Sequence, residues 1–127
     1  MEDLPPVVKL TVEVIALQIA VLVRMKEFLK ASFLAETLCR ARPEAGDWLL
    51  EVADYRRQGG DLDGALSWLR EVEPRCDGLG AFHYLTAQCE QGLGQVQAAK
   101  DSLKRAFRLD EDLRLVALND PAFEGIW

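Results

Sequence analysis

The sequence has few of the residues that build disulfide frameworks or metal sites. It contains three cysteines, Cys39, Cys76 and Cys89, and a single histidine, His83. Three cysteines are too few, and odd in number, for a disulfide scaffold, and one histidine with widely spaced cysteines does not match a zinc motif. We therefore expect reduced thiols in a cytoplasmic setting, with no metal and no cofactor.

Basic residues are also in short supply. The 127 residues include 15 Lys and Arg against 21 Asp and Glu, which gives a formal net charge of −6. A nucleic-acid-binding protein needs a basic face to neutralise phosphates, so this balance argues against one. With 50% hydrophobic and 28% charged residues, the composition is that of a globular protein. The length predicts one domain rather than two.

The one long apolar stretch, residues 7–23, falls short of a membrane span. A transmembrane helix needs about 20 apolar residues, and Lys9 and Glu13 interrupt this run. The start, Met1-Glu2-Asp3, is acidic and lacks the basic residues of a secretory signal. We expect neither a membrane span nor a secretory signal; a first helix associated with a membrane surface is the open alternative.

Motifs for catalysis are absent as well. The sequence has no phosphate-binding glycine loop, no dinucleotide fingerprint and no HExxH zinc motif. Cys76 and His83 flank one loop and could form a nucleophile–base pair. A loop cysteine and a histidine packed at a helix start are the simpler interpretation. We predict no enzymatic activity, and the thiol enzyme remains an alternative that Cys76→Ser would test.

An internal repeat dominates the rest of the sequence. Small and apolar residues recur at one constant spacing, as in Ala53 and Ala87, Gly60 and Gly94, Ala31, Ala65 and Ala99, and Leu69 and Leu103. Small residues allow two helices to approach closely, and glycine tolerates the positive φ found at helix ends. The pattern predicts antiparallel helix pairs, with Asp61 and Gln95 opening the second helix of a pair and Asp the better cap.

This 34-residue period, with a turn glycine followed by Ala five positions later, resembles the tetratricopeptide repeat (TPR) family. The clearest unit includes Tyr84, Ala87, Gly94, Ala99 and Ala106, and the unit before it matches with Leu50, Ala53, Gly60, Ala65 and Val72. The first unit is degenerate, because Ile19 takes the small position and Lys26 replaces the turn glycine; Ala20 suggests a one-residue slip. The family's helix-A tyrosine is replaced by Arg56 and Glu90, and its closing proline by Asp77 and Glu111.

The resemblance implies an all-α fold, a TPR-like α-solenoid of three antiparallel helix pairs with a C-terminal capping helix. The units would span about 12–45, 46–79 and 80–113, with the cap in 112–127. We expect residues 111–118 to form the capping helix and Phe123, Ile126 and Trp127 to fold back onto the last helix. A generic array of helical hairpins is the alternative, and the β-branched run 12–23 could instead form a strand.

The resemblance also implies a partner site on the concave surface, which the first helix of each pair lines. Carried onto this sequence, the partner-binding positions are Asp47, Leu50, Asp54, Arg57, Tyr84, Gln88 and Gln91. Their mixture of apolar and polar groups suits an extended or helical peptide. The family's clamp for C-terminal carboxylates is absent, because Asp54 and Gln88 stand where it requires Asn and its lysines are missing.

The first helix is a second candidate surface, because its apolar residues form two stripes. One comprises Val8, Val12, Ile15, Ile19 and Leu22, and we predict it as an interface; the other comprises Leu10, Val14, Leu17 and Val21. A terminal helix of a solenoid is covered on one side only, so a second stripe stays in water and marks an interface. This helix would pair with itself in a homodimer or with a partner helix.

The function implied is a protein–protein interaction module, a scaffold or adaptor that binds a peptide or helix on the concave face. One alternative is a small chaperone of the type III secretion kind, which holds a secreted or polymerising subunit; a second is a homodimerising structural protein. Lys100, Lys104 and Arg108 form a basic stripe that we interpret as a solvated outer face, with an acidic partner segment as the alternative.

Overall fold

The computed structural model describes residues 6–43, 46 and 48–127, and side chains from residue 11 onward within these ranges. This part of the chain forms seven α-helices, a final 3-10 turn η1, and no strand. The bounds are α1 Pro6–Arg24, α2 Phe28–Ala41, α3 Leu49–Gln58, α4 Leu62–Cys76, α5 Gly80–Gly92, α6 Val96–Leu109, α7 Leu113–Leu118 and η1 Pro121–Phe123. The all-α prediction is confirmed, and the alternative of a strand over residues 12–23 is wrong because they lie in α1.

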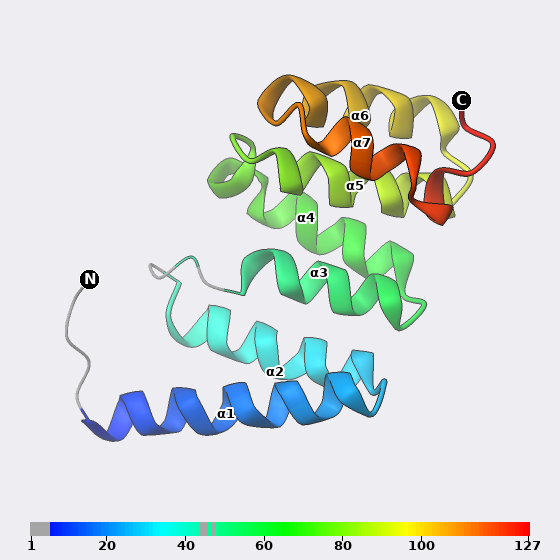
Figure 1. Cartoon of the computed structure of the whole chain (residues 1–127). Helices are drawn as coiled ribbons and strands as arrows, with labels where there is room; N and C mark the ends of the chain where they lie inside the picture. Colours follow the sequence, from blue (N-terminus) through cyan, green and yellow to red (C-terminus); the bar gives the residue numbers. More distant parts are fainter. Residues whose placement is uncertain (1–5, 44–45, 47) are drawn as a thin grey trace.

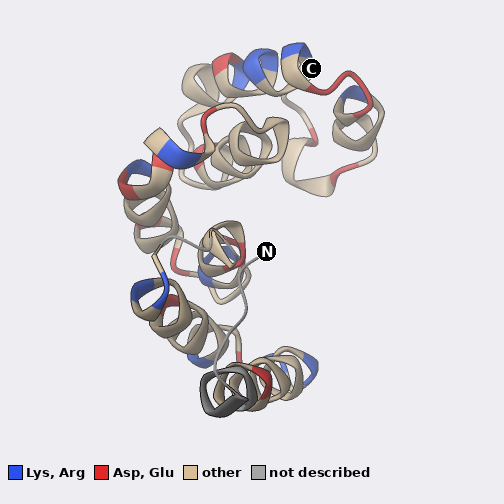
Figure 2. Cartoon of the chain, turned by 90° about the vertical axis from the view of Figure 1, so that its left-hand side faces the viewer, with Lys and Arg blue, Asp and Glu red and all other residues tan. Residues whose placement is uncertain are grey.

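The helices from α1 to α6 stack in the order of the sequence, and each packs against the next (Figure 1). Contacts also join α3 to α5 directly, and η1 packs against α5. Seen along the helix axes, the stack is curved (Figure 2). No helix in the described part of the chain combines the length and hydropathy that a membrane crossing requires.

The turn between the two helices of each pair recurs with the 34-residue period. The helices α1, α3 and α5 end at residues 24, 58 and 92, and their partners α2, α4 and α6 begin at residues 28, 62 and 96. The left-handed turn residue is Lys26, Gly60 or Gly94, with φ of 59°, 90° and 80°. Lys26 therefore adopts the same backbone as the two glycines, although its β-carbon makes this conformation unfavourable.

The hydrogen bonds that close these turns repeat as well. The N–H groups of Glu27, Asp61 and Gln95 donate to the carbonyl oxygens of Leu22, Arg56 and Glu90 at 2.8, 2.8 and 2.9 Å. Among these N-caps, the Asp61 carboxylate accepts a hydrogen bond from the Gly64 N–H at 2.9 Å, whereas Gln95 makes no side-chain cap. Asp61 is thus the better cap, as its residue type predicts.

The buried positions follow the same period. Ile19, Ala53 and Ala87 are 1%, 0% and 0% exposed, and Ala31, Ala65 and Ala99 are all fully buried. The proposed slip to Ala20 is wrong, because Ala20 is exposed and Ile19 occupies the core position. The first pair therefore keeps the register of the other two and accommodates a larger side chain where they carry alanine.

The C-terminal segment completes a second apolar cluster on α5 and α6. Phe123 and Ile126 fold back and are buried as predicted, but they pack with Tyr84 of α5 and Ala106 of α6 rather than on the last helix alone. Trp127 is 61% exposed, and the prediction for it is wrong. The capping helix is shorter than expected, because it begins at Leu113 rather than at residue 111, and it ends at Leu118 as predicted. Of the α7 residues only Ala117 is buried. Most of the apolar surface that covers α5 and α6 therefore comes from η1 and Ile126 rather than from α7.

Candidate functional site

The predicted concave site divides into an α3 part and an α5 part. Asp47 lies outside the described residues. On α3, Leu50 packs at the edge of the main core, and the Asp54 carboxylate accepts hydrogen bonds from Arg57 Nη2 at 2.8 Å and Gln58 Nε2 at 3.0 Å. These partners all lie on one helix, so local contacts hold the α3 part of the site.

On α5, the predicted site residues contact the chain's own C-terminal segment. The Tyr84 hydroxyl donates to Asp120 Oδ2 at 2.6 Å, and Gln88 Nε2 donates to the same oxygen at 2.8 Å. The rings of Tyr84 and Phe123 meet edge to face, with their centroids 5.4 Å apart. Asp120 and Phe123 therefore occupy the place beside Tyr84 and Gln88 where a partner was expected, and the assignment of these two residues to partner binding stays a prediction.

Asp120 is the polar centre of this contact. Its second oxygen, Oδ1, accepts the Ala122 N–H at 2.9 Å, which caps η1. Burial by itself raises the pKa of the Asp120 carboxyl, but hydrogen bonds from Tyr84, Ala122 and Gln88, with the charge of Arg57, bring the pKa below its ordinary value. The carboxylate is thus the form that the folded chain stabilises.

Gln91, the last predicted residue on α5, is half-buried, and its Oε1 atom is buried with no hydrogen-bond partner among the described residues. Asp120 followed by Pro121 is a typical start of a short capped turn, and Phe123 was expected to fold back, but neither signal indicated a contact with Tyr84.

The predicted interface on α1 also requires correction. Val8 lies outside the described side chains. Ile19 is 1% exposed, and Val12, Ile15 and Leu22 pack against the main core, so this stripe faces the molecule's own interior. The opposite stripe is the exposed one. Its members Val14, Leu17 and Val21 are 46%, 68% and 55% exposed.

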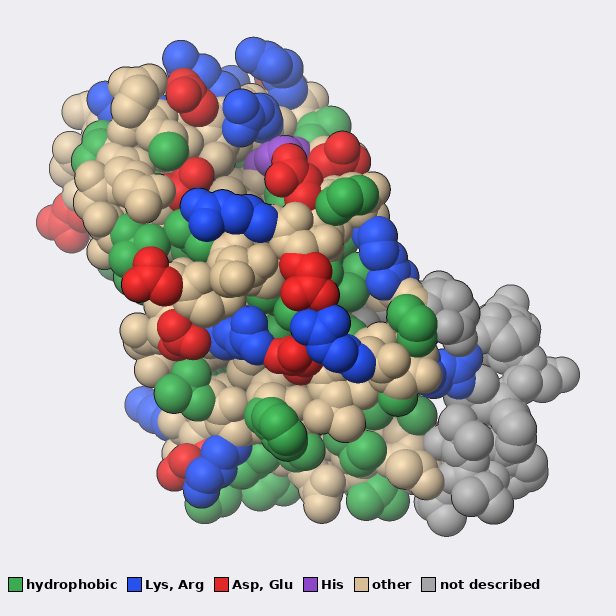
Figure 3. Space-filling model, turned by 180° about the vertical axis from the view of Figure 1, so that it is seen from behind, with side chains coloured by type: hydrophobic (Ala, Val, Ile, Leu, Met, Phe, Trp, Pro, Cys, Tyr) green, Lys and Arg blue, Asp and Glu red, His purple; other side chains and the backbone are tan. Residues whose placement is uncertain are grey.

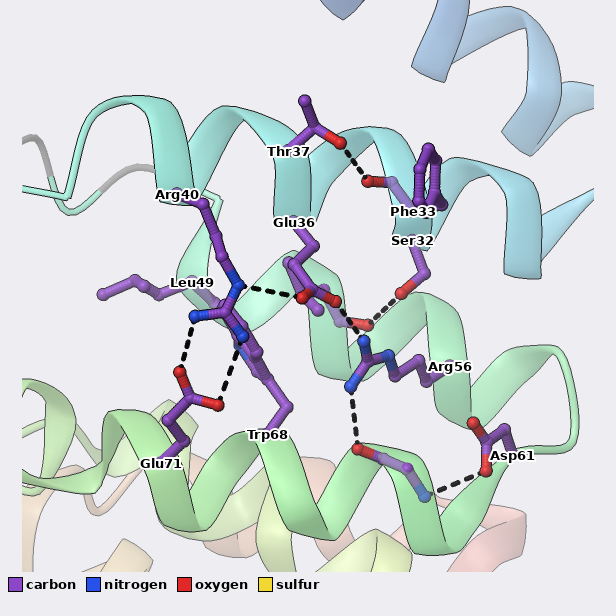
Figure 4. A network of polar contacts seen from close by, with 12 residues as sticks. Ser32, Phe33, Glu36, Thr37, Arg40, Leu49, Arg56, Asp61, Trp68 and Glu71 are labelled. Carbon is purple, nitrogen blue, oxygen red and sulfur yellow. Dashed lines mark hydrogen bonds and ion pairs between the residues drawn. The ribbon is translucent and has the colours of Figure 1, made fainter.

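The side of the molecule formed by the second helix of each pair holds a polar network that sequence reasoning missed (Figure 4). The Arg40 guanidinium bridges two carboxylates, with Nε 3.0 Å from Glu36 and Nη1 2.8 Å from Glu71. Arg56 of α3 also pairs with Glu36, and its Nη1 donates to the Gly64 carbonyl at 3.0 Å. The hydrogen bond from Arg40 lowers the pKa of Glu71 below its ordinary value. The network joins α2, α3 and α4.

Trp68 fills the groove between α2 and α4 beneath this network. Its side chain is 3% exposed, and its indole N–H donates to the Leu49 carbonyl at 2.7 Å. The guanidinium carbons of Arg40 and Arg56 lie 5.1 and 5.7 Å from the ring centroid, within the range of cation–π contacts. We refer to this filled space as the first groove.

The next groove, between α4 and α6, is hollow. Its cavity of about 480 Å³ has a floor formed by three buried residues, Leu66, Leu69 and Phe82. Its other lining residues are Arg70, Glu73, Asp77, His83, Thr86, Glu90, Ser102 and Arg105. Figure 3 shows acidic and basic side chains gathered around the purple histidine on this face. We refer to this cavity as the second groove.

The chemistry expected of an activated thiol is not present at Cys76. Burial raises the pKa of Cys76, and it raises those of Cys39 and Cys89 to about 11 and about 12. A nucleophilic thiol needs the opposite shift. His83 Nε2 lies 2.7 Å from the Asp77 carbonyl oxygen. Within the described ranges, no group of three or more metal-ligating side chains is found.

Comparisons with known proteins identified no relative of this chain. No protein-family model matches the chain, and searches of curated proteins and of solved structures found no significant match either.

Proposed function

We propose that this chain is a protein–protein interaction module, a solenoid of TPR-like helix pairs that docks through the outer face of α1. The recurrence of the same turn, hydrogen bond and buried positions in each helix pair supports the repeat architecture. The observation that carries the function is the exposed stripe of Val14, Leu17 and Val21. A contiguous exposed apolar stripe is typical of a protein interface.

The position of α1 supports this surface over the concave one. The helix lies at one end of the stack, and its inner stripe is already used by the core (Figure 1). On the concave side, by contrast, Asp120 and Phe123 cover the α5 positions. The outer face of α1 is therefore an apolar surface that a partner helix can bury.

A second copy of this chain is the partner that the charges of α1 favour. Glu13 lies toward the N-terminal end of the exposed face and Arg24 at its C-terminal end, and both side chains are exposed. Two α1 helices packed antiparallel and centred near Gln18 would place Glu13 of one copy close to Arg24 of the other. Opposite charges at both ends would fix the antiparallel direction.

The test is the molar mass in solution, measured by light scattering after size-exclusion chromatography. We expect twice the chain mass of 14.2 kDa for the unmodified protein and 14.2 kDa for Leu17→Asp. Leu109→Asp is the matched control, because Leu109 is an exposed leucine on α6, away from α1, and should leave the dimer intact. A monomeric unmodified protein contradicts self-association, and dissociation by both variants contradicts the assignment to α1.

A further inference from the structure

The first and second grooves are equivalent places, one repeat apart. A shift by one repeat carries α2 onto α4, α3 onto α5, and α4 onto α6, with the same turn geometry. The residues of the first groove can therefore be compared one by one with those of the second. The comparison shows which groups the second groove has kept, exchanged or lost.

Charges at three equivalent positions are exchanged. The pairs, with the first-groove residue named first, are Glu36 and Arg70, Arg56 and Glu90, and Glu71 and Arg105. A fourth pair differs in side-chain size, because the buried Trp68 corresponds to the buried Ser102. The Ser102 hydroxyl donates to Glu90 Oε1 at 2.7 Å. At these three charged positions the second groove is thus an inverted copy of the first, and it lacks the indole.

The bridging charge is also missing from the second groove. In the first groove, Arg40 joins Glu36 to Glu71. The residue equivalent to Arg40 is Pro74, which carries no charge. Arg70 and Arg105 make no ion pair or side-chain hydrogen bond within the part of the chain that the structure describes, although both line the cavity.

We propose that the second groove binds a segment of a partner protein in which an aromatic side chain stands beside an aspartate or glutamate. The partner's carboxylate bridges Arg70 and Arg105 as the Arg40 guanidinium bridges two glutamates. The partner's ring enters the hollow beside Ser102, above the buried Leu66 and Phe82. The cavity of about 480 Å³ is in the size range of ligand pockets. This site goes beyond docking through α1 and uses a different surface.

Binding is tested with a fluorescein-labelled peptide, Gly-Ser-Glu-Trp-Glu-Ser-Gly, by fluorescence anisotropy. We expect saturable binding that weakens at least tenfold when the peptide's Trp becomes Ala or its Glu residues become Gln. The double variant Arg70→Glu/Arg105→Glu should weaken binding at least tenfold. Lys100→Glu/Lys104→Glu makes the same change in net charge with exposed residues of α6 and should leave binding within twofold.

Two outcomes of this experiment overturn the proposal. One is the absence of saturable binding to the unmodified protein. The other is an equal loss in the two double variants, which would show that the overall charge of the chain, rather than the groove, attracts the peptide.

A second variant pair examines the carboxylate bridge without disturbing either arginine. Pro74→Glu places an acid where the repeat puts Arg40, so the chain supplies its own bridge. Pro74→Gln is the control, because it removes the same exposed proline and differs only in charge. We expect Pro74→Glu to bind the peptide at least tenfold more weakly than Pro74→Gln. Equal affinity would overturn the assignment of the bridge.

Discussion

The two ends of the helix stack dispose of their apolar surface in different ways. At one end, α1 covers the core with one stripe and exposes Leu17 on the other. At the opposite end, the chain turns back so that Phe123 and Ile126 bury themselves against α5 and α6. A stack of helix pairs has an unsatisfied face at each end. Here a short tail closes only the C-terminal end, and only in part, because Leu115, Val116, Leu118 and Trp127 remain 51–67% exposed.

The largest effect should come from breaking the closed end. Phe123 is fully buried against Tyr84, so Phe123→Ala should lower the free energy of unfolding by about 3–5 kcal/mol. Trp127→Ala, four residues on, removes a side chain that is 61% exposed and should change stability by no more than about 0.5 kcal/mol. Urea denaturation measures both, and equal effects would mean that the tail does not close this end.

The polar half of the same contact should give a smaller, pH-dependent effect. The pKa of Asp120 is below its ordinary value of 3.8, so its carboxylate stabilises the fold at pH above 3.8, and this stabilisation is lost as the pH falls through the lowered pKa. Asp120→Asn should cost about 1–3 kcal/mol at pH 7, because Tyr84 and Gln88 lose a charged acceptor.

Urea denaturation at several pH values measures the difference between Asp120→Asn and the unmodified protein. That difference should shrink as the pH falls below 3.8. If the difference in the free energy of unfolding stays constant from neutral to acidic pH, the role assigned to the Asp120 charge is contradicted.

The smallest effect should appear in the turn at the open end. Lys26 holds a left-handed backbone that Gly60 and Gly94 adopt without a β-carbon. Lys26→Gly should therefore stabilise the chain by about 1 kcal/mol, whereas Lys26→Ala keeps the β-carbon and should be nearly neutral. Thermal unfolding of both variants separates the backbone effect from the loss of the amine. A destabilised Lys26→Gly would mean that the lysine side chain itself supports the turn.

Much of the fold followed from residue spacing because the helix pair is set by local rules. The turn glycines and the buried alanines recur once per repeat, and these positions fix where each helix ends and which face is inside. Ile19 shows that register outweighs residue size, since it stays buried at a position where the other pairs carry alanine.

The site was harder to predict because it depends on contacts between segments far apart in the sequence. Nothing near Tyr84 indicates that Asp120 will reach its hydroxyl, and two equally apolar stripes on α1 gave no reason to prefer the exposed one. The exchange of charge between Glu36 and Arg70 was visible in the aligned repeats. The structural role of this exchange became clear only from the ion pairs and cation–π contacts around Trp68.

The exchanged charges also make neighbouring repeats non-interchangeable during folding. Similar units in tandem tend to mispair, one helix taking the place of its counterpart in the next unit. Here α2 brings Glu36 to Arg56. If α4 docked in its place, Arg70 would face Arg56, and two guanidinium groups would repel each other where an ion pair belongs. The charge of the side chain at this repeat position therefore determines which neighbouring helix each helix can pair with.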